Sequence, residues 1–95
     1  MIDIKQGENK FYVGDNQEEP LAEIHFVPTG ATKLIVDHTY VSDGLRGQGF
    51  GEALVERIVT FAREEQKQII PLCPFAKSQI DRHEEYQDVL KDRQN

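Results

Sequence analysis

Residues 46–51 read Arg-Gly-Gln-Gly-Phe-Gly, and they separate two stretches with different hydrophobic patterns. Before them, KLIVDHTYV at 33–41 is rich in β-branched and aromatic residues on both faces, which is typical of an interior strand. After them, from Gly51 to Gln66, apolar residues recur at helical spacing. These residues are Leu54, Val55, Ile58, Val59, Phe61 and Ala62. The sequence therefore predicts a glycine-rich loop that leads from a strand into a helix.

Such a loop exposes backbone N–H groups at the positive end of a helix dipole, where an anion such as phosphate binds. The alternative is a tight turn that needs glycine only for its geometry. The P-loop pattern fails, because Phe50 and Gly51 stand where Lys and Ser or Thr are required. The dinucleotide pattern fails at Glu52, and Pro-Leu-Cys at 71–73 replaces the acidic residue expected about 20 positions on.

Outside this unit, the sequence predicts further strands and one more helix. Strands are expected at 10–13 and 21–27, joined as an antiparallel hairpin or meander. Another short strand is expected at 68–73, at a sheet edge or distorted, because Pro71 lacks a backbone donor. A second helix is expected from Pro74 to about Leu90. The predicted fold is α+β, a mixed and mostly antiparallel sheet with a β-α-β-α unit.

Length and composition limit the class of protein. Ninety-five residues, 38% hydrophobic and 29% charged, predict one soluble domain over 1–95 with a polar tail from about residue 91. A net charge of −6 argues against a general nucleic-acid binder, and no apolar stretch approaches a membrane span. The single cysteine, Cys73, excludes a disulfide and a multi-cysteine metal site. The first ten residues lack a secretory apolar core, so the expected location is cytoplasmic.

Residues 46–51 resemble the (R/Q)-x-x-G-x-(G/A) signature of the GCN5-related N-acetyltransferases, whose loop holds the pyrophosphate of acetyl-CoA. Three other segments resemble a short, single-domain branch of this family that includes N-acetyltransferase-domain-containing proteins. DHT at 37–39 precedes the loop, and PLCPF at 71–75 and RHEEY at 82–86 follow it. The resemblance extends from about Ala22 to Val89 and implies a minimal form of that family's fold.

The resemblance implies acetyl-CoA as co-substrate, without a metal, and transfer of its acetyl group to an unidentified amine. The expected pyrophosphate contacts are the backbone N–H groups of Gly47, Gly49, Phe50, Gly51 and Glu52. Arg46 either adds its guanidinium to a phosphate or is a solvated charge. The pantetheine arm is expected between strands 36–41 and 69–73, with Val41 near the loop.

Cys73 and His38 are the first candidates for catalytic residues. Pro74 is favoured at the first position of a helix, so Cys73 is expected at a helix N-terminus, where the dipole favours a thiolate. Cys73 either takes the acetyl group from CoA or is a small buried apolar residue. Strict strand alternation puts His38 on the face of Val36 and Tyr40. Because its strand and the strand at 68–73 are expected to be neighbours, His38 is also expected within reach of Cys73. His38 is then a base or a hydrogen-bonded core histidine.

Tyr86 is the third candidate, because in many members of the family a tyrosine of the last helix protonates the departing CoA thiolate. A packing tyrosine is the alternative. Full-length members have N-terminal helices that wall the acceptor site, and this chain has no room for them. A non-enzymatic acyl-CoA-binding module or sensor is therefore an alternative function. A slow acetyl-CoA hydrolase that uses a Cys73 acyl-enzyme is another, and the sequence predicts no oligomeric state.

Overall fold

The computed structural model describes residues 2–90, so the predicted polar tail lies outside the described residues. Within them, the strands are β1 (Lys5–Gly7), β2 (Lys10–Val13), β3 (Ala22–Thr29), β4 (Lys33–Val41) and β5 (Gln68–Pro71). The helices are η1 (Asp43–Leu45), α1 (Phe50–Glu65), α2 (Pro74–Arg82) and η2 (Glu84–Val89), where η denotes a 3-10 helix.

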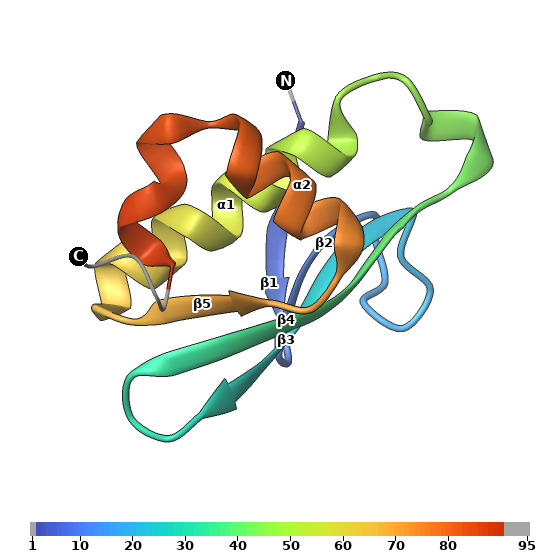
Figure 1. Cartoon of the computed structure of the whole chain (residues 1–95). Coiled ribbons are helices and arrows are strands. Elements are labelled where there is room, and N and C mark those ends of the chain that lie inside the picture. Colours follow the sequence, from blue (N-terminus) through green and yellow to red (C-terminus); the bar gives the residue numbers. More distant parts are fainter. Residues whose placement is uncertain (1, 91–95) are drawn as a thin grey trace.

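The strands form one sheet in the order β1-β2-β3-β4-β5. The pairs from β1 to β4 are antiparallel, and β5 pairs with β4 in parallel after the crossover through α1 (Figure 1). The parallel pair follows from the crossover, because a helix between two strands returns the chain in its first direction. This arrangement confirms the α+β prediction, with β4 in the interior and β5 at an edge.

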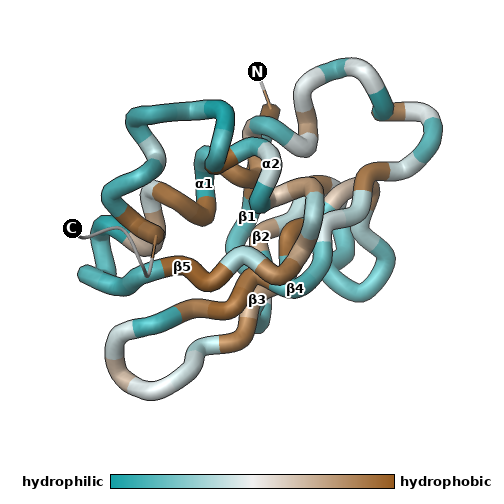
Figure 2. Tube along the Cα trace, viewed as in Figure 1, coloured by the Kyte–Doolittle hydropathy of each residue, from teal (hydrophilic) through white to brown (hydrophobic). Residues whose placement is uncertain are grey.

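The core lies between one face of the sheet and the helices. The sheet residues buried there are Phe11, Ala22, Ile24, Phe26, Leu34, Val36 and Ile69. The helix residues buried against them are Leu54, Val55, Ile58, Val59, Ala62, Ala76, Ile80 and Val89. Figure 2 shows apolar stretches of β4 and β5 running side by side below α1 and α2. Among residues 2–90, no helix has the length and apolar character needed to cross a membrane.

The pairing of β3 with β4 contains a bulge. His25 pairs with His38 and Phe26 pairs with Val36, so Asp37 is an additional residue in β4. Two residues of a bulged strand oppose one residue of its partner, and the alternation of side chains shifts by one position there. The side chain of Asp37 turns to the open face, where its Oδ1 lies 2.8 Å from His25 Nδ1.

This bulge overturns the predicted position of His38. The prediction put His38 on the face of Val36 and beside Cys73, but Val36 is buried and His38 is exposed. The imidazole lies instead on the open face of the sheet, with Nε2 3.3 Å from Oε2 of Glu23. Strict alternation is wrong here because the additional residue reverses it, and Thr39 takes the place that His38 was expected to hold.

The predicted helix from Pro74 to about Leu90 is also wrong in its second half. Helix α2 ends at Arg82, and His83 has an extended conformation with φ −116° and ψ 103° before η2 begins. A straight helix of this length would run about 25 Å and carry its end away from the core. The break instead returns the chain to α1, where Val89 is buried.

Arg63 of α1 holds the returning segment η2. Its guanidinium binds both carboxylate oxygens of Asp88, with Nη2 2.8 Å from Oδ1 and Nε 3.0 Å from Oδ2. It also donates to the backbone carbonyl of Glu85. This bidentate pairing fixes the position of Tyr86, which packs against the core and stacks on His83 with 4.8 Å between the ring centroids.

Candidate functional site

The site lies where β4 and β5 separate. Their last pair is Val36 with Pro71, and the N–H groups of Leu72 and Cys73 both donate to the Val36 carbonyl at 3.0 Å. Beyond this point β5 gives way to α2, whereas β4 continues to Val41 without a β5 partner. An opening between the end of β4 and the start of α2 results.

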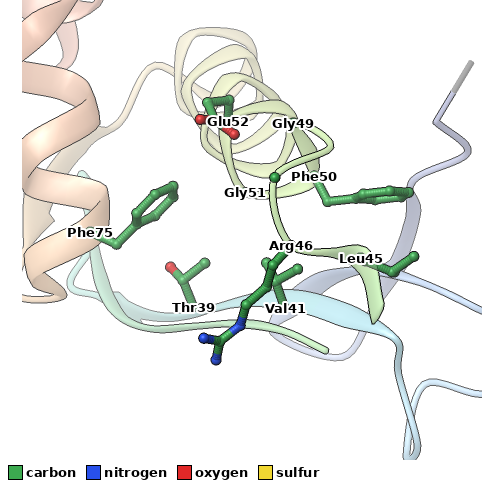
Figure 3. Close-up of a pocket in the computed structure, with 10 residues that line it drawn as sticks. Thr39, Val41, Leu45, Arg46, Gly49, Phe50, Gly51, Glu52 and Phe75 are labelled. Carbon is green, nitrogen blue, oxygen red and sulfur yellow. The ribbon is translucent and has the colours of Figure 1, made fainter. Parts of the chain in front are cut away.

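A pocket of about 440 Å³ occupies this opening (Figure 3). Its walls come from the end of β4, the glycine segment, the start of α1 and the start of α2. The lining residues are Thr39, Val41, Leu45, Arg46, Gly47, Gly49, Phe50, Gly51, Glu52 and Phe75. All seven residues that the sequence nominated for cofactor binding therefore line one pocket, while their binding role stays a prediction.

The glycine segment leaves backbone N–H groups without an intrahelical acceptor in residues that line the pocket. Gly47 has φ 80° and Gly49 has φ 85°, a left-handed conformation that favours glycine. Gly49 is the N-cap of α1. The first N–H group that donates within the helix is that of Ala53, which lies 3.0 Å from the carbonyl oxygen of Gly49. The N–H groups of the first turn are consequently available to a ligand. Gln48 braces the loop by donating to the Gly44 carbonyl at 3.1 Å.

Charge at the pocket comes from the helix end and from two side chains. Arg46 is exposed, and its Nε lies 3.4 Å from Oδ1 of Asp43 in a solvated pair that a stronger anion can replace. Glu52 lies in the first turn of α1, where the helix dipole stabilises a carboxylate. A bound anion would therefore meet backbone N–H groups and Arg46, with Glu52 on the rim.

Phe75 forms the wall on the α2 side, and its ring points toward the start of α1 (Figure 3). A β-carbon built on Gly51 would lie 2.7 Å from Cζ of Phe75. Phe75 is 37% exposed and lines the pocket, so it offers an apolar surface there.

Cys73 lies behind the pocket wall. It is the N-cap of α2 with Pro74 at the first helical position, as predicted from the sequence. The residue is only 7% exposed and belongs to the hydrophobic core. Its Sγ lies 3.3 Å from Oγ1 of Thr39, a residue of the pocket wall. The thiol is thus one side chain away from the pocket.

The structure does not bring the three candidate catalytic residues together. Cys73 lies behind Thr39, His38 lies on the opposite face of the sheet, and Tyr86 packs in η2 and is not part of the pocket wall. Burial raises the pKa of Tyr86, and Glu56 and Glu85 raise it further. Among residues 2–90, no cluster of three His, Cys, Asp or Glu side chains could hold a metal ion.

Three pocket residues were missed by the sequence analysis. Thr39 was passed over because strict alternation assigned its face to His38. Leu45 lies in η1, a short turn that the sequence shows only as a break. Phe75 belongs to the PLCPF motif, but its place in the pocket depends on how α2 packs beside α1, and no local sequence pattern indicates this packing.

Comparison with known families and structures identifies the fold. The family model of the GCN5-related N-acetyl-transferases matches residues 10–89, which is most of the chain. The chain belongs to the GCN5-related N-acetyltransferase family. Comparison with curated proteins gives no match. The family assignment confirms the resemblance seen in the sequence and supports an acetyltransferase enzyme.

Solved structures agree with this assignment. A GCN5-like candidate N-acetyltransferase from Staphylococcus aureus is 46% identical, with a TM-score of 0.79 over 94% of this chain and 87% of that one. A GNAT-family acetyltransferase from Staphylococcus aureus Mu50 shares the fold at 14% identity and a TM-score of 0.55, over 65% of this chain and 40% of that one. The ribosomal-protein-alanine N-acetyltransferase of Brucella melitensis biovar Abortus 2308 also shares the fold. It is 19% identical, with a TM-score of 0.55 over 78% of this chain and 62% of that one.

Proposed function

We propose that the protein binds acetyl-CoA in this pocket and transfers the acetyl group to an amine acceptor. The main support is that residues nominated by a family signature converge on one pocket at the start of α1. Free N–H groups at a helix N-terminus suit a pyrophosphate, and Arg46 can add a charge-assisted hydrogen bond.

The rest of the pocket suits the pantetheine arm. The opening between β4 and β5 leaves main-chain groups of β4 without a β5 partner, and amides of an extended ligand can pair with them. Val41, Leu45 and Phe75 supply apolar surface along this route. A ligand held by its phosphates at the glycine segment would extend its acetyl end toward Thr39.

A thermal-shift titration with acetyl-CoA, CoA, NAD and ATP tests the binding step. A ligand at 100 times its dissociation constant adds about 2.7 kcal/mol to the free energy of unfolding, which raises the Tm of so small a domain by roughly 10 °C. We expect this rise with the two CoA species and not with NAD or ATP. Equal Tm values with and without saturating CoA species would refute the proposal. Acetylation of an amine panel then tests transfer.

A Cys73 acyl-enzyme, with water or an amine as final acceptor, is a second candidate because Thr39 connects the thiol to the pocket wall. Intact-mass measurement after exposure to acetyl-CoA tests it, and a gain of one acetyl group at Cys73 would support it. A non-catalytic acyl-CoA-binding module is the third candidate, since α1 and α2 lie over the same face of the sheet and the other face is left open among residues 2–90 (Figure 1). Saturable CoA binding without turnover on any amine would favour this module.

A further inference from the structure

The hydroxyl of Thr39 lies between the pocket and the buried thiol. Its Oγ1 is 3.3 Å from Sγ of Cys73, and Thr39 itself lines the pocket. A hydroxyl oxygen is a better acceptor than a thiol sulfur, so the S–H of Cys73 donates to Oγ1. Thr39 therefore receives a hydrogen bond from the core side.

The hydrogen of the Thr39 hydroxyl then needs a different acceptor. A hydroxyl has one hydrogen and two lone pairs, and the contact with Cys73 uses a lone pair. Within residues 2–90, no protein atom accepts the hydroxyl hydrogen. Because Thr39 lines the pocket, this donor is available to a ligand.

Thr39 also lies at the end of the pocket where a reactive group would arrive. The glycine segment marks the other end, and β4 runs from there back to the bulge at Asp37. Near this bulge β5 leaves β4, since Val36 accepts the last hydrogen bonds from the β5 side. A ligand anchored at the start of α1 and extended along β4 ends near the Thr39 hydroxyl.

We propose that Thr39 donates a hydrogen bond to the thioester carbonyl oxygen of acetyl-CoA, and that Cys73 is a positioning residue that orients this hydroxyl. The inference rests on the proposed function. Thr39 is then a catalytic residue, while the thiol of Cys73 stays intact throughout the reaction.

The reaction step follows from this geometry. The lone pair of the amine nitrogen attacks the carbonyl carbon, and the electrons of the C=O bond move to the oxygen, where the Thr39 O–H stabilises the growing negative charge. The C–S bond then breaks, its electron pair stays on the CoA sulfur, and the proton lost by the nitrogen passes to that sulfur. The products are the acetylated amine and CoA. Removal of one such donor lowers the rate by about 100-fold.

Ligand affinity tests the inference without an acceptor, because acetyl-CoA has the carbonyl and CoA lacks it. In Thr39→Val, whose side chain has nearly the same shape, we expect acetyl-CoA to bind about fivefold more weakly while CoA binds as in the wild type. Thr39→Ser keeps the hydroxyl, so its affinities for acetyl-CoA and CoA should have the same ratio as in the wild type. Calorimetric titration of each variant with both ligands measures this difference.

Variants of Cys73 separate a positioning role from an acyl-enzyme. Cys73→Ser keeps a donor beside Thr39 and should retain most of the turnover with the best amine of the panel, whereas Cys73→Ala should lose part of it. An acetyl adduct on Cys73 in the wild type would overturn the assignment.

The remaining outcomes are equally decisive. If Thr39→Val binds both ligands as the wild type does, the hydrogen bond to the carbonyl is refuted while the proposed function stands. If the wild type binds neither acetyl-CoA nor CoA, the proposed function fails, and this inference fails with it.

Discussion

The ring of Phe75 lies where a side chain at position 51 would begin. An ideal β-carbon on Gly51 would be 2.7 Å from Cζ and 2.9 Å from Cε2 of that ring, closer than real β-carbons approach. Gly51 is a residue of α1 and needs no left-handed conformation. Packing of α2 against the start of α1 therefore explains this glycine, in addition to any approach of a ligand.

This contact predicts that the effect of Gly51→Ala depends on Phe75. Alanine favours a helix interior over glycine by about 1 kcal/mol, but here its methyl group must displace the ring. In the wild-type background we expect Gly51→Ala to be neutral or destabilising. In a Phe75→Ala background the same substitution should stabilise the protein by up to about 1 kcal/mol.

Urea unfolding of the wild type, both single variants and the double variant measures this coupling. Effects of independent sites add to within about 0.3 to 0.5 kcal/mol, so additivity in this cycle would contradict the contact. Phe75→Ala should also weaken acetyl-CoA binding, because it removes apolar surface from the pocket wall.

Gly49→Ala is expected to damage binding more than stability. The residue has φ 85°, and a left-handed conformation costs a residue with a β-carbon roughly 1 to 2 kcal/mol. The added carbon would meet open space and clash with no residue beyond its chain neighbours, and Gly49 itself lines the pocket. We expect at least a tenfold loss of acetyl-CoA affinity, about 1.4 kcal/mol.

Gly30 offers a matched control for this substitution. It has φ 64°, an added β-carbon would meet open space there as well, and it lies in the turn between β3 and β4. Gly30→Ala should lose a similar amount of stability and keep full acetyl-CoA affinity. Equal affinity losses in the two variants would show that general destabilisation, and not the pocket, is responsible.

Local patterns in the sequence were sufficient for much of the fold. The strand at Lys33–Val41 has the predicted bounds, and helix α1 begins and ends within one residue of the prediction. Both elements have strong hydrophobic periodicity. Strand β1 (Lys5–Gly7) was missed, because three residues without an apolar side chain carry no periodic signal and form a strand only through pairing with β2.

The site could be predicted only where a contiguous motif defines it. The glycine segment needs no information beyond its neighbours in the chain, and its residues do line the pocket. The candidate catalytic residues depended on register and on the path of the last segment. A bulge at Asp37 moved His38 to the other face, and the break at His83 returned Tyr86 to α1.

The bulge gives a prediction for two adjacent residues of β4. His38 pairs with Glu23 on the open face, while Thr39 faces the pocket. We expect His38→Gln to leave acetyl-CoA affinity and turnover within twofold of the wild type, an energetic change below about 0.5 kcal/mol. Thr39→Val should change both the acetyl-CoA affinity and the turnover. A large loss of turnover in His38→Gln, with acetyl-CoA affinity kept, would return His38 to the role of a base.

Tyr86→Phe should separate packing from acid catalysis. The folded protein raises the pKa of Tyr86, mainly because burial disfavours the phenolate and further because Glu56 and Glu85 lie nearby. The unfolded chain releases this proton near pH 10, so stability is complete below that pH and falls as the pH rises through the higher folded value. Phenylalanine has no proton to release. The Tyr86→Phe variant should therefore lose less stability than the wild type between about pH 9 and pH 11, which urea unfolding at several pH values in this range would measure.

At pH 7 the turnover of Tyr86→Phe should equal that of the wild type, since Tyr86 is not part of the pocket wall. A folded variant with impaired turnover would instead identify Tyr86 as the acid that protonates the departing thiolate.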